Sequence, residues 1–446
     1  MFKKSFLVAS SKKIESFNKF IKVDSDKSIS IRSLLIGSIS NNISKIDNIL
    51  ESDDVFASIA CLKNLGVKIR KKNNSYYIFG KGLGSLSIKK NKDLYFDNSG
   101  TLARLLIGIL TTTPDINLRM RGDKSLSNRS MRELIQEMEK FGAEFLPKKK
   151  YKLPLKIISS NIPVGINYLS GKSAQIKSAV ILAGLNSYGT TKIIEDQKSR
   201  NHTENILLKS PSSIKIKRGK KNIINVYGKK NLNALNLKVP GDPSSAAFFV
   251  SLCLLTKFSK LKIRDVQLNS TRTGFFRILK KYGAKIYFKK IRKRNNEIIG
   301  DIEVAPSKIK SLKVNKSFYV NSTDEYPIMF VIAALTPGVS IFKGVSGLKN
   351  KESNRVIEMQ KILSQVGIKS VFVKDILKIF GKKEIKNVGQ VINVSSILDH
   401  RICMSALILS LVTGIKSKIN NFETVRTSSP NFLKIIKSLG GKYEIK

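Results

Sequence analysis

The sequence contains no tryptophan, two histidines, three cysteines and only 32 acidic residues against 81 basic ones. The cysteines, Cys61, Cys253 and Cys403, are too few and too scattered for a disulfide framework or a zinc site, so we expect a cytoplasmic protein. Apolar runs such as Ala246–Leu255 and Ile328–Leu335 fall well short of the roughly 20 residues that span a bilayer. These absences exclude a disulfide-rich secreted domain, a zinc protein and a transmembrane protein.

The shortage of acidic residues leaves a formal net charge of +49, which is typical of proteins that bind nucleic acid or another polyanion. The positive charge is spread along the whole chain, and Lys, Ile, Asn and Ser, whose codons are AT-rich, are all abundant. We interpret the charge as compositional drift and keep a polyanion-binding surface as the alternative. The 446 residues, 41% of them hydrophobic, suffice for about two to four domains.

A short pattern of an apolar residue, glycine, a small or apolar residue and a strand-like residue recurs five times. Its glycines, Gly66, Gly142, Gly283, Gly367 and Gly440, are separated by 76, 141, 84 and 73 residues. Each copy follows an amphipathic stretch, so each glycine is expected to end a helix before a strand. The interval of 141 residues is about twice the others, so it predicts a sixth copy near residue 212, where the glycine is lost. The chain is therefore predicted to repeat a helix–strand unit six times.

Six polar clusters alternate with these glycines, and each opens an apolar segment. Taking Ser28, Gly100, Ser173, Ser244, Tyr326 and His400 as markers, the steps are 72, 73, 71, 82 and 74 residues. A helix that is apolar nearly all round is buried, and its polar start is a capped N-terminus. Helix N-termini bind anions, and Lys27, Arg104, Arg129, Arg355 and Arg401 all lie near these starts. Six ordinary capped helices are the alternative; an anionic substrate follows if the starts converge.

At these positions the chain resembles the bacterial 5-enolpyruvylshikimate-3-phosphate synthases (3-phosphoshikimate 1-carboxyvinyltransferases). The resemblance runs from Asp26 to Gly440 and rests on motifs in one order: DKSISIRS, NSGTLARLL, GDKSLSNRSM, SAQIKSAVILAGL, SRNHTE, VPGDPSSAAFF, NSTDEYP, KNKESNRV and LDHRICMS. It implies an α/β (α+β) enolpyruvyl transferase fold with six βαβαββ repeats, three per domain. The buried parallel helices are expected to point their N-termini at the interdomain cleft. We expect one domain at 1–23 plus 239–446 and the other at 24–238.

The resemblance also implies the reaction. The enolpyruvyl group of phosphoenolpyruvate passes to the 5-hydroxyl of shikimate 3-phosphate and inorganic phosphate leaves, on the route to chorismate and the aromatic amino acids. No metal or organic cofactor is expected, the partners are the two small anionic substrates, and neither a membrane nor nucleic acid is expected to bind. We further expect a monomer that closes over its ligands, and competition between glyphosate and phosphoenolpyruvate.

The resemblance assigns the chemistry to four side chains. Asp324 is expected to accept the proton of the 5-hydroxyl; its alternative role is an N-cap carboxylate before the helix near Ile328. Glu352 and Lys27 are expected to handle the proton at C3, although Glu352 could instead be a salt-bridge partner of Lys351 or Arg355. His400 is expected beside the reacting centre, where it could orient Glu352 or begin a helix against Asp399. His202 is expected to be structural.

The binding residues are carried over position by position. For shikimate 3-phosphate they are Lys27, Ser28, Arg32, Ser173, Ala174 (through its backbone), Gln175, Arg200, Asp324 and Lys351. For phosphoenolpyruvate they are Lys27, Gly100, Arg129, Gln175, Arg355 and Arg401. Gly100 is expected to let the ligand approach backbone N–H groups at a helix start, with a plain turn glycine as its alternative.

The chain departs from the family pattern at six positions: Asp24, Ser25, Ser130, Asn354, Leu398 and Ser429. Most of these positions affect loop rigidity or packing rather than reacting groups, and Asp24 places an unexplained carboxylate near an anion site. Two rival functions remain open. One is enolpyruvyl transfer to UDP-N-acetylglucosamine, disfavoured because Gly122–Met131 lacks the reactive cysteine typical of that enzyme. The other is a degenerate copy that binds a polyanion, which steeply salt-dependent RNA binding would support.

Overall fold

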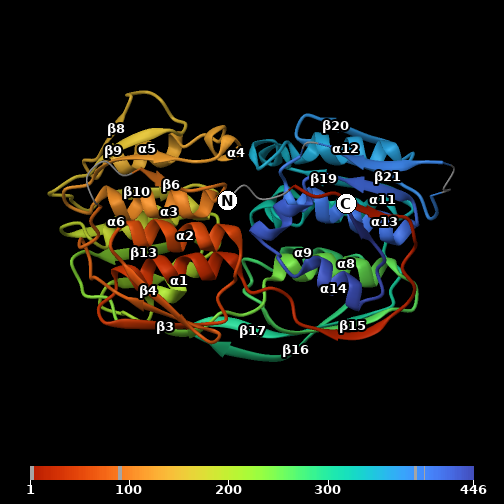
Figure 1. Ribbon diagram of the computed structural model, residues 1–446, viewed down its shortest axis with the longest axis horizontal. Coiled ribbons are helices and arrows are strands. Elements are labelled where there is room, and N and C mark those ends of the chain that lie inside the picture. The colour runs from red at the N-terminus through yellow and green to blue at the C-terminus, as the bar shows by residue number, and fades with distance from the viewer. Residues whose placement is uncertain (1–4, 89–92, 386–388, 396) are drawn as a thin grey trace. The chain divides into compact units, whose positions relative to one another are not determined.

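The computed structural model describes residues 5–88, 93–385, 389–395 and 397–446. The chain divides into two compact units, and each is described by itself (Figure 1). Unit 1 comprises Met1–Asp24, Pro240–Lys293 and Ile298–Lys446, and unit 2 comprises Ser25–Val239 and Arg294–Glu297. The predicted bounds, 1–23 plus 239–446 and 24–238, differ from these units at three places: Asp24 belongs to unit 1, and Val239 and residues 294–297 belong to unit 2.

Within the described residues, each unit contains three four-stranded sheets of the same topology. In every sheet the first two strands are parallel and the third is antiparallel to the second. The sheets of unit 2 are β14 (Asn236–Lys238), β3 (Ile43–Asp47), β5 (Ser75–Phe79) and β4 (Lys68–Lys72); β6 (Leu94–Tyr95), β7 (Asn117–Arg121), β9 (Leu155–Ile158) and β8 (Glu144–Leu146); and β10 (Asn167–Ser170), β11 (Thr190–Glu195), β13 (Asn222–Tyr227) and β12 (Ile214–Lys217).

The sheets of unit 1 draw two strands from the N-terminal segment. They are β2 (Asn18–Ile21), β15 (Lys260–Gln267), β17 (Glu297–Ala305) and β16 (Lys285–Arg294); β18 (Lys313–Val314), β19 (Gly338–Lys343), β21 (Ile376–Gly381) and β20 (Ser370–Val373); and β22 (Val391–Val394), β23 (Lys416–Ile419), β1 (Val8–Ser10) and β24 (Glu444–Ile445). Strand β1 lies between β23 and β24, and β2 is the edge strand beside β15. Unit 1 is therefore completed by the beginning of the chain.

The six polar clusters begin six buried helices, as the second series predicts. These helices are α1 (Lys27–Ile39), α3 (Gly100–Thr111) and α6 (Ala174–Gly184) in unit 2, and α8 (Pro243–Leu255), α11 (Tyr326–Ala334) and α13 (His400–Thr413) in unit 1. Asp26, Ser99, Ser173, Asp242 and Asp399 each accept a hydrogen bond from a backbone N–H of the first turn. Such capping typically contributes about 1 kcal/mol per helix.

The recurring glycines end five outer helices, as the first series predicts. All five have positive φ, between 70° and 100°, which is the left-handed conformation that glycine adopts without strain. The helices before them are α2 (Asp53–Asn64), α5 (Arg132–Glu139), α9 (Gly274–Lys281), α12 (Arg355–Gln365) and α14 (Phe432–Ser438). The sixth copy is α7 (His202–Leu207), which precedes β12 without a glycine. Shorter helical turns are α4 (Lys124–Ser127), α10 (Tyr319–Ser322), η1 (Lys316–Phe318), η2 (Ser346–Asn350) and η3 (Phe422–Thr427).

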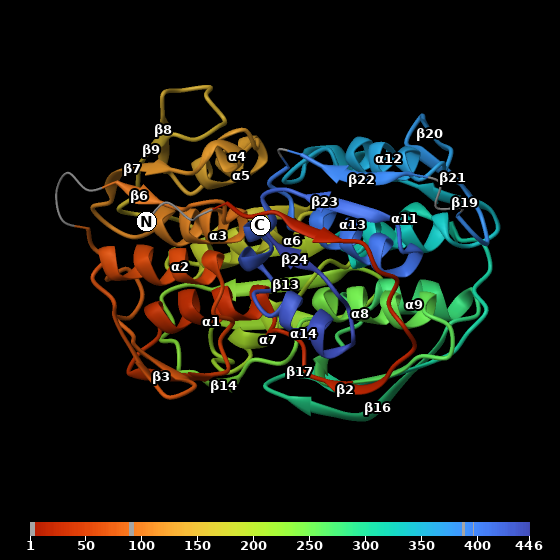
Figure 2. The same ribbon diagram turned by 45° about the vertical axis from the view of Figure 1, so that its right-hand side comes forward.

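Each unit packs its buried helices around its own hydrophobic core. In unit 2, α3 contacts both α1 and α6 (Figure 1); in unit 1, α8, α11 and α13 contact one another. Figure 2 shows α8 and α9 on the sheet that contains β2, β16 and β17. Within the described residues, no helix combines the length and apolar character needed to cross a membrane.

Candidate active site

The N-terminus of α1 carries Lys27, whose ammonium group forms an ion pair with the buried Asp54 of α2. The distance from Lys27 Nζ to Asp54 Oδ2 is 2.9 Å. Asp26, one residue earlier, accepts a hydrogen bond from Ile29 N at 2.7 Å and so fixes the start of the helix. Lys27 is thereby held at the helix start. The sequence analysis missed Asp54, because an acidic residue in the first turn of a helix is ordinary.

Arg32 lies one turn further along α1 and is 2% exposed. Its Nε donates to Thr203 Oγ1 at 2.9 Å, its Nη1 to Ser28 O at 3.1 Å and its Nη2 to Ser178 Oγ at 3.3 Å. Ser28, predicted to bind substrate, thus also orients Arg32 through its carbonyl group. Thr203 and Ser178 come from α7 and α6, and the sequence analysis assigned neither a role.

Gly100 is the first residue of α3 and borders two guanidinium groups. A Cβ at this position would lie 2.7 Å from Arg104 Nη1 and 3.0 Å from Arg129 Nη1. Arg129, which follows α4, donates from Nη2 to Asn98 Oδ1 and, at 3.3 Å, to Ser125 Oγ. A side chain at position 100 would therefore displace the ends of these two arginines.

The start of α6 lies against α3 in the same unit. Gln175 donates to Thr101 Oγ1 at 2.9 Å and accepts from Arg104 Nη1 at 3.1 Å. Ser173 is the N-cap of α6 and Ala174 its first residue, so both predicted positions lie at a helix N-terminus. Gly100, Arg104, Arg129 and Gln175 thus form one group beside the starts of α3 and α6. Arg200 lies between β11 and α7, half-buried, two residues before α7 begins.

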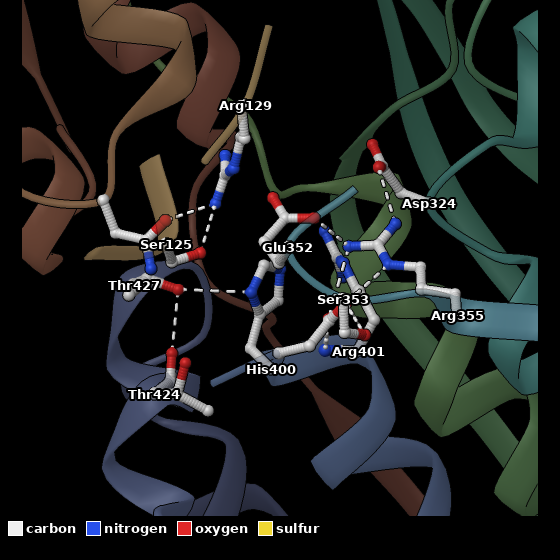
Figure 3. A network of polar contacts seen from close by, with 12 residues as sticks. Ser125, Arg129, Asp324, Glu352, Ser353, Arg355, His400, Arg401, Thr424 and Thr427 are labelled. Atoms are coloured by element: carbon white, nitrogen blue, oxygen red, sulfur yellow. Dashed lines mark hydrogen bonds and ion pairs between the residues drawn. The ribbon is translucent and has the colours of Figure 1, made fainter. Parts of the chain in front are cut away.

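Unit 1 is organised around Arg355, the first residue of α12, which is 1% exposed. Its guanidinium group contacts three carboxylates: Asp399 at 2.9 Å, Glu352 at 2.7 Å and Asp324 at 3.6 Å (Figure 3). Burial acts to lower the pKa of Arg355, but the charges of Asp399, Glu352 and Asp324 outweigh it and hold the pKa above its ordinary range. Arg355 therefore stays charged and fixes the two predicted catalytic carboxylates.

Both alternative roles of these carboxylates can be compared with the structure. The N-cap position of α11 is Glu325, so the N-cap reading of Asp324 is wrong. The salt-bridge reading of Glu352 is correct in that it pairs with Arg355 three residues later. Lys351 precedes Glu352 directly after η2 and is half-buried. Asp324, Lys351, Glu352 and Arg355 are thus placed by three elements, α10, η2 and α12.

Arg401 and His400 begin α13, and both are 4% exposed. Arg401 donates its backbone N–H to the N-cap Asp399 at 3.0 Å, and its guanidinium carbon lies 5.7 Å from the centre of the Phe248 ring. Within the described parts of the chain, its Nε and Nη1 atoms are buried and have no hydrogen-bond acceptor. His400 Nδ1 lies 3.3 Å from Thr427 Oγ1 (Figure 3). A buried arginine with two N–H donors that lack an acceptor is the expected state of an anion-binding residue before its ligand arrives.

Two of the departures from the family pattern contact each other. The buried Asp24 carboxylate accepts from Ser429 Oγ at 2.8 Å, from Asn431 Nδ2 at 2.7 Å and from Asn431 N at 3.2 Å. This explains the carboxylate that the sequence left unexplained: it ties the end of the first segment of unit 1 to the loop before α14. Asn354 keeps a plain structural role as the N-cap of α12.

Comparisons with proteins of similar sequence identify the family. The sequence profile of the EPSP synthase (3-phosphoshikimate 1-carboxyvinyltransferase) family matches residues 11–436. The 3-phosphoshikimate 1-carboxyvinyltransferase of Paramagnetospirillum magneticum is 36% identical over 424 residues, 94% of each chain, and that of Zymomonas mobilis is 34% identical over 98% of this chain and 97% of its own.

Solved structures agree with the sequence relatives. The EPSP synthase of Acinetobacter baumannii superposes with a TM-score of 0.85 at 31% identity, covering 99% of this chain and all of its own. The enolpyruvyl transferase NikO of Streptomyces tendae has a TM-score of 0.79 over 99% of both chains at 11% identity, which shows the shared fold. Sequence, fold and the arrangement of the helix starts lead to one conclusion: this chain belongs to the EPSP synthase family.

Proposed function

We propose that this enzyme transfers the enolpyruvyl group of phosphoenolpyruvate to the 5-hydroxyl of shikimate 3-phosphate, as the names of its relatives indicate. The observation that carries the proposal is Arg401, a buried cation whose Nε and Nη1 lack acceptors within the described residues, next to the Arg355 cluster. Buried charges are normally paired, so the ligand of Arg401 is an anion. Phosphoenolpyruvate supplies both a carboxylate and a phosphate.

The reaction is a proton-coupled addition followed by elimination. The oxygen of the 5-hydroxyl forms a bond to C2 of phosphoenolpyruvate while its proton leaves and another proton adds to C3. The tetrahedral intermediate then loses inorganic phosphate as C3 gives up a proton, and the enol ether double bond forms again. The protein must supply a base for the hydroxyl, an acid and base at C3, and cations for the phosphate and carboxylate groups.

We assign these roles to the side chains that the structure fixes. Asp324, held by Arg355, accepts the proton of the 5-hydroxyl. Glu352 and Lys27 exchange the proton at C3, and each has a charged partner that sets its position, Arg355 and Asp54 respectively. A fixed carboxylate within hydrogen-bond reach of its proton is what general base catalysis requires. His400 lies next to Arg401 at the start of α13 and is assigned to the same reacting centre.

The cations and polar groups bind the two substrates. Phosphoenolpyruvate is assigned to Lys27, Gly100, Arg129, Gln175, Arg355 and Arg401. Shikimate 3-phosphate is assigned to Lys27, Ser28, Arg32, Ser173, Ala174, Gln175, Arg200, Asp324 and Lys351. Arg129 belongs to unit 2 and Arg401 to unit 1, so the assignment draws on cations of both units.

Phosphate release from the purified protein tests the proposal. We expect release only when both substrates are present, and a loss of about 10²-fold or more in kcat for Asp324→Asn, which keeps the shape and removes the base. Glu358→Gln on α12 is the matched control, because its exposed ion pair with Lys361 lies outside the assigned residues. Wild-type protein that releases no phosphate would refute the function; an active Asp324→Asn would refute only the role of Asp324.

A further inference from the structure

Two buried hydroxyl groups lie behind Arg32 in unit 2 and have no role in the function proposed above. They belong to Thr203 on α7 and Ser178 on α6, and both side chains are fully buried. Thr203 Oγ1 and Ser178 Oγ lie 2.8 Å apart, and Arg32 donates to both, from Nε at 2.9 Å and from Nη2 at 3.3 Å. One edge of the guanidinium group therefore faces two oxygen atoms from two different helices.

The direction of the two hydrogen bonds from Arg32 is fixed by chemistry. Arginine has donors only, so both hydroxyl oxygens must accept from it. Thr203 has a single hydroxyl hydrogen, which it donates to Ser178 Oγ. Ser178 Oγ thus accepts from both Thr203 and Arg32. This pair presents an acceptor surface to Arg32, and a substitution that removes the Thr203 oxygen leaves Nε of a buried cation without that acceptor.

A buried ion cluster of Lys177, Glu195 and Glu204 adjoins the hydroxyl pair. Lys177, next to Ser178, is completely buried and contacts Glu195 at 2.6 Å and Glu204 at 2.7 Å. Burial acts to lower the pKa of Lys177, but the charges of Glu204 and Glu195 outweigh it and raise the pKa, so the lysine stays charged. Because Glu204 follows Thr203 in sequence, the cluster joins α6, β11 and α7 at the point where the hydroxyl pair forms.

The same cluster reaches the segment that carries Arg200. Glu195 Oε1 accepts from both the backbone N and the Oγ of Ser199, each at 2.9 Å. Ser199 directly precedes Arg200, so the two arginines assigned to shikimate 3-phosphate are held by one framework: Arg32 through the hydroxyl pair and Arg200 through its neighbour. Buried networks of hydrogen bonds and ion pairs rigidify the side chains that they hold.

We propose that Thr203 is a positioning residue for shikimate 3-phosphate: with Ser178 it holds the guanidinium group of Arg32 in the orientation that binds this substrate. The inference rests on the proposed function and deepens it. Thr203 acts through Arg32 rather than by touching the substrate. It therefore governs the affinity for shikimate 3-phosphate, and it leaves the affinity for phosphoenolpyruvate and the chemical steps nearly unchanged.

Steady-state kinetics and calorimetric binding of shikimate 3-phosphate to Thr203→Val and Thr203→Ser test this proposal. Valine keeps the branched shape and loses the acceptor, so we expect the KM and Kd for shikimate 3-phosphate to rise about tenfold or more. The KM for phosphoenolpyruvate and kcat should stay within about twofold. Thr203→Ser keeps the oxygen and should restore the wild-type Kd.

Thr111→Val is the matched control, because Thr111 is also a fully buried helical threonine but donates to Ile107 O of its own helix. It should leave both KM values unchanged. If Thr203→Val does not fold, Ser178→Ala replaces it, with a smaller expected rise in Kd because its contact to Arg32 is longer. The proposal is overturned if Thr203→Val binds shikimate 3-phosphate normally or weakens the binding of both substrates equally. It is also overturned if Thr203→Ser does not restore the binding of shikimate 3-phosphate. Wild-type protein that neither binds shikimate 3-phosphate nor releases phosphate would refute the function itself.

Discussion

At the scale of the residue, the sequence supplied candidates for the reactive side chains but not the groups that hold them. Arg355 was recognisable from its motif, whereas its pairing with Asp399 joins positions 44 residues apart. The motif that contains Asp399 pointed instead to His400 and Arg401. A motif lists residue types along the chain, and contacts across the fold leave no trace in one sequence. The same reason explains why Asp54, Thr203 and Ser178 were missed.

The contact between Asp24 and Ser429 yields a prediction of coupling between two departures from the family pattern. Because Ser429 donates to the buried Asp24 carboxylate, removing either partner should cost part of the same interaction. We expect Asp24→Ala and Ser429→Ala to be non-additive, with an interaction free energy of about 0.5–3 kcal/mol in urea unfolding. Additive losses would contradict the contact, and pairing Asp24→Ala with Thr111→Val, which belongs to the other unit, supplies an additive control.

The protonation of the same carboxylate makes the stability of the folded protein depend on pH. Burial raises the pKa of Asp24, and hydrogen bonds from Asn431 and Ser429 offset this only in part. The folded protein then keeps a proton that the unfolded chain has lost, so stability from this group falls as pH rises from the ordinary value of 3.8 through the raised one. The unfolding free energy of wild type relative to Asp24→Ala should therefore be greater at about pH 4 than at about pH 7.

At the scale of the element, the sequence predicted the two helix series because both leave local marks. Glycine at the end of a helix and a polar cap before an apolar stretch are read within a few residues. The sixth outer helix, α7, was harder to place because its glycine is missing. The chain turns there through consecutive backbone bonds, from Ser210 N to Leu207 O and from Ser213 N to Ser210 O, and needs no left-handed residue.

The close contact of α3 with α6 yields a prediction for Gly108. A Cβ at Gly108 would lie 2.5 Å from Ala179 O and 2.7 Å from Ala179 Cα, both backbone atoms that cannot yield. For Gly108→Ala we expect an overpacking cost of about 1–3 kcal/mol, which outweighs the gain of about 1 kcal/mol in helix propensity. Gly37→Ala in α1 is the control, since its nearest contact is a side-chain atom at 3.3 Å. Urea midpoints that are equal for the two variants would contradict the close approach.

At the scale of the whole molecule, the sequence indicated a domain inserted into another, but not the return of residues 294–297. These four residues are the last residue of β16, the two-residue turn and the first residue of β17, and a hairpin tip carries no periodic signal that tells which unit it packs against. The net charge of +49 can be read from the composition, and two of its arginines, Arg355 and Arg401, lie at the starts of α12 and α13.

Closure of the two units is the prediction that belongs to this scale. Anions bound by cations from both units should draw the units together, so the radius of gyration measured by small-angle scattering should fall when shikimate 3-phosphate and phosphoenolpyruvate are both present. To keep turnover from consuming the ligands, the measurement uses Asp324→Asn. Arg401→Gln in the same background should lose the phosphoenolpyruvate-dependent part of the compaction. An unchanged radius with both ligands would contradict closure.

The place of β1 within its sheet also sets the order in which the chain can fold during synthesis. Val8 pairs with Ile419 on one side and with Ile445 on the other, so β1 cannot take its place until the ribosome has added roughly 400 more residues. At typical translation rates that delay lasts roughly 20 to 80 seconds, while most of unit 2, synthesised early as the continuous run Ser25–Val239, is already available to fold. The backbone groups of β1 therefore stay unpaired in the nascent chain during this time. Because β1 spans only Val8–Ser10, it offers other chains only a short strand edge on which to aggregate.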